Sequence, residues 1–283
     1  MTTARLHILR TYFIVLLAFV ASISISLHGQ NKQLHIFYTN DSHSRIEPYV
    51  TSSASPGLGG YVRRNTFMKK MRATYPDLLL FDSGDFWQGT PYFNIFYGEV
   101  SMLLMQDAGY DAAALGNHEF DLGMDNMKRQ FEKVDFPILS ANYDFSNTVL
   151  RDVIKPYVVL ERKGLKIGVF GLTPNPDGLI QKSNYEGAVY SNPITTAQKM
   201  VTLLHDQKKC DLVVCLSHLG LYTDKKLAAA TRGIDIILGG HSHTYMLEPE
   251  YVKNLDGKLI PISQMGSLGR SIGEMTLTFQ VKQ

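Results

Sequence analysis

Clusters of potential metal ligands stand directly after five short apolar runs of this sequence. An isolated aspartate or asparagine at the end of a strand usually caps a helix or forms a turn. Neither role explains the five histidines found in the same clusters. We therefore expect the clusters to bind metal ions together. They are TNDSH at 39–43, DSGD at 82–85, GNHEFD at 116–121, SH at 217–218 and GGHSH at 239–243.

The donor atoms in these clusters fit two divalent ions better than one. Two carboxylates, one amide oxygen and four imidazoles exceed the four ligands of a tetrahedral zinc site. Two dications about 3.5–4 Å apart repel each other, so a bridging anion such as a shared carboxylate must lie between them. Nitrogen and oxygen ligands without thiolate favour Mn, Zn, Fe or Co over Ca or Mg, and leave the choice among these four open. The donors are Asp41, His43, Asp85, Asn117, His218, His241 and His243.

Short apolar runs with the length and β-branched content of buried strands alternate with stretches of helical spacing. This alternation predicts an α/β fold with mainly parallel strands. Ligands of open α/β sheets bind beyond the carboxyl ends of the strands, where the clusters stand. Residues 251–281 indicate hairpin-like strands around an Asp256-Gly257 turn. The predicted strands are 34–38, 78–81, 112–115, 167–172, 212–216 and 234–238, and the predicted helices are 62–71, 100–108, 124–133 and 195–208.

The composition is that of a globular protein with a sizeable core. Of the 283 residues, 45% are hydrophobic and 19% charged, which excludes a disordered tail, a collagen-like repeat and a disulfide-stapled miniprotein. Arg5 and Arg10 account for the formal charge of +2. The balanced remainder gives no sign of a nucleic-acid partner. Cys210 and Cys215 are five residues apart on one predicted strand, about 16 Å when extended, which is too far to bridge each other. We therefore expect buried, unpaired thiols.

The first residues have the pattern of a secretory signal peptide. A basic start is followed from residue 11 to residue 27 by a stretch without charged residues. We take residues 1–29 as the signal and expect a secreted, periplasmic protein without stable membrane insertion after cleavage. The alternative is an uncleaved N-terminal anchor that faces the periplasm, but the apolar stretch is short of the about 20 residues that a span needs.

The chain resembles the calcineurin-like metallophosphoesterase superfamily in the order of its motifs. More narrowly, it is similar to the catalytic domain of the bacterial 5'-nucleotidase and UDP-sugar hydrolase family. The resemblance covers nearly all of the chain after the signal segment and implies a four-layer αββα sandwich of two mixed sheets flanked by helices over residues 30–283. The motifs are YTNDSHSRIEPY, GLGGYVRR, FDSGDFWQGTP, LGNHEFDLG, SANYD, CLSHLG and GGHSHT.

The resemblance also assigns roles to individual residues. It implies a catalytic dyad of His118 and Asp121, with Asn117 and His118 next to the substrate. It implies two ions that share Asp85. One ion would be bound by Asp41, His43, Asp85 and His243, and the other by Asp85, Asn117, His218 and His241.

The implied reaction is hydrolysis of phosphate monoesters of nucleotides. Two metal ions lower the pKa of a water so that metal-bound hydroxide attacks, and they neutralise the phosphoryl oxygens. His118 would stabilise the phosphoryl transition state or donate a proton to the leaving oxygen. Asp121 on the other ring nitrogen would fix the tautomer and raise the pKa of His118. Asp121 also fits a simpler role in the first turn of a helix, where the dipole favours it.

Other functions and a missing domain stay open at this point. The same scaffold could cleave UDP-sugars, 2',3'-cyclic nucleotides or a thiosulfate ester. A non-catalytic nucleotide- or metal-binding module is the alternative of another class, although a binder would not need His118. Members of this family usually continue into a C-terminal nucleoside-binding domain, which we expect this protein to lack. We expect either a promiscuous phosphatase or a separate C-terminal-type nucleotidase subunit as a partner.

Overall fold

The apolar runs that the sequence marks as strands are strands in the computed structural model, which describes residues 31–48 and 57–280. The predicted signal peptide, residues 1–29, lies outside these described residues. Residues 33–278 form one compact unit. Outside that unit, the side chains of Asn31 and Gln280 hydrogen-bond each other (3.1 Å).

One large sheet is built mostly from the N-terminal half of the chain. The five strands that it takes from residues 31–155 run parallel to one another, as the alternation with helices predicts. The sheet contains, in spatial order, β14 (Gly273–Gln280), β1 (Asn31–Thr39), β2 (Leu79–Asp82), β3 (Ala112–Ala114), β4 (Ile138–Leu139) and β6 (Ile154–Lys155).

The second large sheet is built from the C-terminal half. Its four central strands run parallel, and its two outer strands are antiparallel to their neighbours. A small separate sheet pairs β5 (Tyr143–Asp144) with β9 (Val189–Tyr190). The large sheet contains, in spatial order, β12 (Glu250–Lys253), β13 (Leu259–Ser263), β11 (Ile236–Gly239), β10 (Leu212–Ser217), β8 (Leu165–Leu172) and β7 (Tyr157–Arg162).

Helices begin and end at residues suited to those positions. The side chain of Asn192 accepts a hydrogen bond from Thr195 N at the start of α6, which has Pro193 as its first residue. Helix α4 ends at Gly109, whose φ of 76° favours glycine. The helices are α2 (Tyr61–Thr74), α3 (Pro91–Phe96), α4 (Glu99–Ala108), α5 (Gly123–Phe131), α6 (Pro193–Thr202) and α7 (Leu221–Ala230), with short 3-10 helices at His118–Phe120 and Lys182–Asn184.

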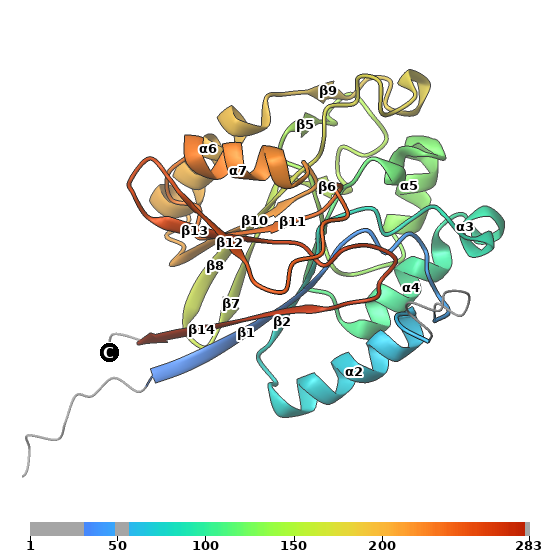
Figure 1. Cartoon of the computed structure of the whole chain (residues 1–283). Coiled ribbons are helices and arrows are strands. Elements are labelled where there is room, and N and C mark those ends of the chain that lie inside the picture. The colour runs from blue at the N-terminus through green and yellow to red at the C-terminus, as the bar shows by residue number, and fades with distance from the viewer. Residues whose placement is uncertain (1–30, 49–56, 281–283) are drawn as a thin grey trace, which may run out of the picture. The chain divides into compact units, whose positions relative to one another are not determined.

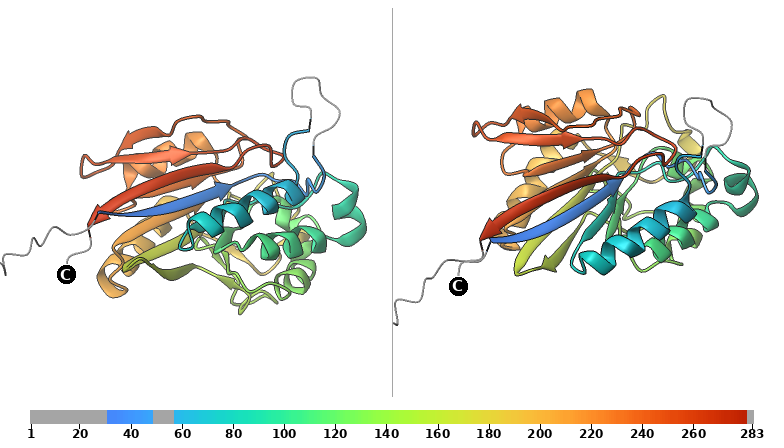
Figure 2. Two further views of the ribbon diagram at one scale, coloured as in Figure 1. Left: turned by 90° about the horizontal axis from the view of Figure 1, so that it is seen from below. Right: turned by 60° about the horizontal axis from the view of Figure 1, so that its bottom comes forward.

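The sheets and helices form four layers. One buried cluster joins the N-terminal sheet to α2, α4 and α5, and includes Met68, Met105 and Met127. A second cluster joins the C-terminal sheet to α6 and α7, and includes Val201 and Leu227. The inner faces of the two sheets lie against each other, through β3 and β4 on one side and β8 and β10 on the other. Figures 1 and 2 show this order of layers, and the predicted αββα sandwich is confirmed.

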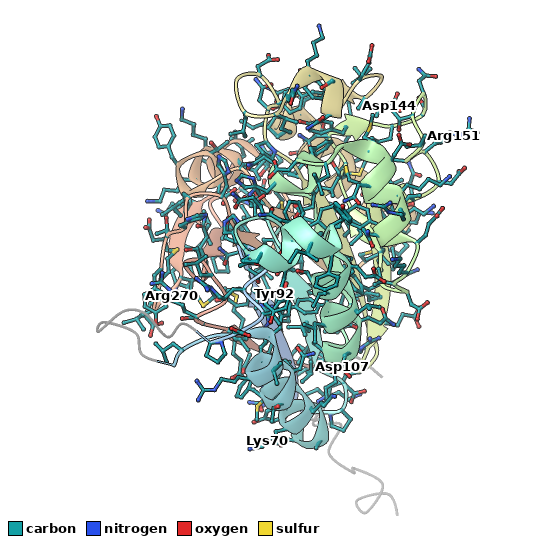
Figure 3. All side chains as sticks on the ribbon, turned by 90° about the vertical axis from the view of Figure 1, so that its right-hand side faces the viewer. Lys70, Tyr92, Asp107, Asp144, Arg151 and Arg270 are labelled. Carbon is teal, nitrogen blue, oxygen red and sulfur yellow. The ribbon has the colours of Figure 1, made fainter. Side chains whose placement is uncertain are left out.

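The helices of one outer layer pack side by side. Lys69 of α2 forms an ion pair with Asp107 of α4 (2.9 Å). Figure 3 shows Lys70 and Asp107 at one end of the molecule, with Tyr92 of α3 nearer the middle of the view. These helices pack on the outer face of the sheet. The ends of its strands are continued by loops.

Two predicted elements differ in extent from the structure. Strands β12 and β13 form the expected hairpin, in which Asn254 N bonds to Lys258 O (2.9 Å), but β14 joins β1 in the other sheet. The helix predicted for 195–208 ends at Thr202 and continues as a π-helical turn at Leu203–Gln207. Local spacing indicates a strand or a helix, but it does not say which sheet edge an outer strand will join.

Cys210 and Cys215 are both buried and unpaired, as predicted. Within residues 31–48 and 57–280, no helix has the length and apolar character needed to cross a membrane.

Candidate metal centre

The five polar clusters stand at the carboxyl ends of strands from both large sheets. In the first sheet, Thr39 at the end of β1 pairs with Asp82 at the end of β2. In the second, Ser217 at the end of β10 pairs with Gly239 at the end of β11. Because these strands are parallel and end level with one another, their following loops lie together.

Hydrogen bonds join the loops of one sheet to those of the other. The Ser83 hydroxyl donates to Leu238 O (2.8 Å), and the Ser83 carbonyl lies 2.6 Å from His218 Nδ1. The backbone N–H of His241 donates to the Asp41 carboxylate (3.0 Å). The ligands predicted from distant parts of the sequence therefore lie in one region, which is buried at Asp41, Asp85 and His218 and exposed at His243.

Three groups of ligand atoms come together there, each with its members within 4.8 Å of one another. The first and second groups each contain three of the four ligands that the family resemblance implies for one ion. A third group includes His118 and overlaps both. The groups are Asp41, His43 and His243; Asp85, His218 and His241; and His43, Asp85 and His118.

The unpaired atoms of this region fit metal ions. Asn117 Oδ1 is buried without a hydrogen-bond partner, and such atoms are rare in native proteins unless an ion or water satisfies them. His218 Nε2 is also buried and lies 3.0 Å from Asp85 Oδ2. The Nδ1 atoms of His218 and His43 face the carbonyls of Ser83 and Trp87, at 2.6 and 3.3 Å. Each imidazole therefore presents its Nε2 to the site, which is the usual arrangement of a metal-binding histidine.

Burial and the close carboxylates shift the ionisation of these side chains. Burial lowers the pKa of His43 and of His241. Burial also opposes the charged form of His218, but Asp85 and Asp41 outweigh it and raise the pKa of His218 to about 10. Burial would raise the pKa of Asp85, yet the charge and hydrogen bond of His218 hold it below its usual range. In the metal-free protein, the His218 proton thus offsets negative charge that divalent ions would otherwise neutralise.

The backbone of the site adopts conformations that ordinary residues seldom take. Such left-handed conformations cost energy in non-glycine residues and persist only where the surroundings enforce them, most often at functional sites. Five of the seven predicted ligands have them. These are Asp41 (φ 48°), His43 (φ 45°), Asp85 (φ 55°), His241 (φ 72°) and His243 (φ 53°).

Two glycines allow the loops to approach each other. A Cβ on Gly116 would lie 2.1 Å from Asp85 Oδ1, and one on Gly84 would lie 2.6 Å from the backbone nitrogen of Gly116. Any side chain at either position would push the Asp85 loop away from the loop that carries Asn117. The glycines of the GD and GNH motifs are therefore required by close packing of the ligand loops.

His118 and Asp121 form a hydrogen-bonded pair at the rim of the site. His118 Nδ1 lies 2.9 Å from Asp121 Oδ2, at the short 3-10 helix that follows Asn117. The backbone N–H of His118 donates to Asp85 Oδ1 (2.9 Å), which connects the pair to the metal ligands. The hydrogen bond of Asp121 raises the pKa of His118 and favours the imidazolium. Both side chains are about one-third exposed, so a substrate can reach them.

Glu119 is an important residue of this region that the sequence analysis left without a role. Its carboxylate is fully buried and accepts hydrogen bonds from the backbone N–H groups of Gly116, Asp85 and Trp87, at 2.7, 3.0 and 3.1 Å. Burial and the charge of Asp85 raise the pKa of Glu119 to about 8 in the metal-free protein, while these N–H donors favour the ionised form. Glu119 fastens two ligand loops together. Its place next to His118 was the only signal for it.

Comparison with known proteins agrees with this arrangement. A family model for the calcineurin-like phosphoesterases matches residues 34–245. The chain belongs to this family. The match includes every predicted metal ligand and both members of the predicted dyad. The superfamily expected from the motifs is thus confirmed, and with it the expectation of a phosphoesterase fold.

The relatives of this calcineurin-like phosphoesterase include several nucleotidases. The chain is 34% identical to a 5'-nucleotidase of Diplobatis ommata over 87% of its own length and 46% of the relative's. It resembles the crystal structure of a 5'-nucleotidase precursor from Thermus thermophilus with a TM-score of 0.82 and 34% identity, over 88% of this chain and 52% of the other. A Haemophilus influenzae NAD nucleotidase gives a TM-score of 0.81 and 27% identity, over 89% and 48%. The chain spans about half the length of these relatives.

Proposed function

We propose that this protein is a dinuclear metal-dependent phosphohydrolase that cleaves phosphate monoesters of nucleotides. The observation that carries the proposal is the meeting of two ligand groups with the His118–Asp121 pair at one end of the sandwich. The 5'-nucleotidase relatives support the choice of substrate class.

Different residues of the chain would have different roles in such a reaction. Divalent ions bound by the seven ligands would supply an activated water and neutralise the phosphoryl oxygens. Asn117 would serve as a neutral ligand that can also lie near a phosphoryl oxygen. His118 carries a proton at Nε2 while Asp121 holds Nδ1, and this proton can stabilise the phosphoryl group or pass to the leaving oxygen.

A second candidate is cleavage of a pyrophosphate linkage, as in a UDP-sugar. The likeness to an NAD nucleotidase, at 27% identity, favours it over a cyclic nucleotide. The likeness to a sulfate thiohydrolase, at 19% identity, is one of fold alone and gives no support for a thiosulfate ester. A binding module without catalysis leaves the His118–Asp121 pair unexplained.

The test is metal analysis joined to a substrate panel. The protein purified without added metal should contain close to two ions per chain. It should release phosphate from AMP faster than from UDP-glucose or 2',3'-cyclic AMP. A chelator should abolish turnover, and Mn or Co should restore it.

Other outcomes lead to other conclusions. Faster turnover of UDP-glucose than of AMP would favour the second candidate. Two bound ions without turnover of any substrate would show a binding module. Export to the periplasm, a separate nucleoside-binding subunit and the restriction of the metal to Mn, Zn, Fe or Co stay predictions from the sequence.

A further inference from the structure

A single buried amide holds the loop that carries the last two histidine ligands. Gln264 follows β13 and has no exposed surface. Its Nε2 donates to the carbonyl of Gly240 (2.9 Å). Its Oε1 accepts from Ser242 Oγ (3.0 Å) and from the backbone N–H of Thr244 (3.2 Å). These three partners alternate with the two histidines, so one side chain binds the loop on both sides of each ligand.

The loop needs such support because its backbone is strained at both ligands. His241 and His243 have φ values of 72° and 53°. A non-glycine residue in this region costs of order 1–3 kcal/mol and persists only when neighbouring contacts enforce it. Since Ser242 and His243 are exposed, packing gives little of this support. The hydrogen bonds of Gln264 supply it, together with those from His241 N to the Asp41 carboxylate and from Gly266 N to Thr244 O.

The residues after Gln264 hold the first ligand loop in the same way. Asn40 exchanges hydrogen bonds with this segment, since its Oδ1 accepts from Met265 N and its Nδ2 donates to Gly266 O, both at 2.8 Å. The N–H of Leu268 donates to the carbonyl of Asp41 (2.7 Å). The segment from 264 to 268 therefore connects the loops that carry Asp41, His43 and His243.

We propose that Gln264 is a positioning residue for the metal centre, which sets His241 and His243 in their binding geometry before any ion arrives. The inference rests on the proposed metal-dependent function. Gln264 is neutral, and its three hydrogen bonds go to Gly240, Ser242 and Thr244 of the loop, so it acts on the ligands through the loop. An amide suits this task because it donates to a carbonyl and accepts from two donors at once.

The test is the variant Gln264→Met, which keeps the length of the side chain and removes its hydrogen bonds. Metal-free protein is titrated with Co²⁺ by calorimetry, and the visible spectrum of the bound ion is recorded. We expect the affinity for Co²⁺ to fall about 10- to 100-fold, as for other residues that orient metal ligands. The visible spectrum of bound Co²⁺ should change as well, because His241 and His243 are no longer held in a fixed orientation around the ion.

A matched control is Gln106→Met. Gln106 also fastens a loop with its amide, by donating to Asp135 Oδ2 (2.9 Å) and accepting from Asp135 N (3.0 Å), but it stands on α4, away from the ligands. This control should lose some thermal stability and bind Co²⁺ as wild type does. Equal Co²⁺ affinity in wild type and Gln264→Met would overturn the proposal.

A milder variant keeps the test open if Gln264→Met does not fold. Ser242→Ala changes an exposed side chain and removes one of the three bonds to Gln264, together with the bonds of the Ser242 hydroxyl to Leu221 N and Thr244 Oγ1. We expect a loss of Co²⁺ affinity of about 3- to 10-fold, as for one hydrogen bond. Unchanged affinity here would contradict the role of Gln264. Failure of the proposed function is a separate result, namely wild-type protein that binds Co²⁺ but turns over no nucleotide.

Discussion

The Nε2 atoms of His43 and His243 lie 3.0 Å apart, although 200 positions separate the two residues in the chain. Asp41 Oδ1 lies 3.3 Å from the same atom of His243. Two imidazole nitrogens and a carboxylate oxygen at this spacing can share one divalent ion.

Replacement of His243 should therefore remove one ion and leave the other. In His243→Ala, the group of Asp85, His218 and His241 is intact, so metal analysis should find about one ion per chain in place of two. The control His205→Ala removes a histidine that bonds to backbone carbonyls of Cys210 and Gly233, and it should retain both ions. Loss of both ions in His243→Ala would contradict two separable sites.

The role of His118 can be tested with leaving groups of different quality. A nucleoside alkoxide needs a proton to leave and a nitrophenolate does not, so His118→Ala should lose about 10²–10⁴-fold in turnover of AMP. It should lose far less with nitrophenyl phosphate. The comparison is of kcat/KM for the two substrates in both proteins. An equal loss with both would assign His118 to the phosphoryl group instead.

The hydrogen bond from Asp121 gives a companion prediction. Asp121→Asn keeps the size of the side chain but no longer favours the imidazolium of His118. Turnover of AMP should fall about 10- to 100-fold while metal content stays unchanged. A fall in metal content would mean that Asp121 serves the ligand loops.

Glu119 should stabilise the folded protein, because it joins two loops that carry predicted metal ligands. Glu119→Gln retains one acceptor oxygen but turns an NH₂ group toward backbone N–H donors, which should cost about 1–3 kcal/mol in the free energy of unfolding. Urea denaturation of the metal-free protein measures this. Glu132→Gln, at an exposed position beside Lys128, should stay within about 0.5 kcal/mol of wild type. Similar stability of the two variants would show that Glu119 does not hold the ligand loops together.

The buried carboxyl group of Asp224 should make the stability of the metal-free protein depend on pH. Burial raises its pKa to about 7, above the about 3.9 of an unfolded chain. The native state therefore keeps a proton that the unfolded state releases, and stability falls as pH rises from about 4 to about 7. Asp224→Asn removes this titration, so the stability of the variant relative to wild type should increase over that range. Urea denaturation with a chelator at several pH values measures the difference, and a constant difference would contradict the raised pKa.

Much of the architecture was determined by the sequence alone. Strand length, helical spacing and the position of each polar cluster are local properties, so the strands that carry the site were predicted close to their observed bounds. The seven candidate ligands could be named because histidine at a strand end has no common structural explanation, and the carboxylates and the amide stand in the same clusters as the histidines. The family followed from the order of those motifs.

Only the tertiary structure showed how these parts meet. The approach of His43 to His243, the three donors on Glu119 and the three partners of Gln264 depend on how two sheets pack and where their strands end. Gln264 stands after a strand with no motif around it, and its partners lie 20 to 24 residues away. The sheet that β14 joins likewise depends on packing and not on the local sequence. Periodicity reports the environment of a residue, whereas its partners are chosen by sheet register and packing across the fold.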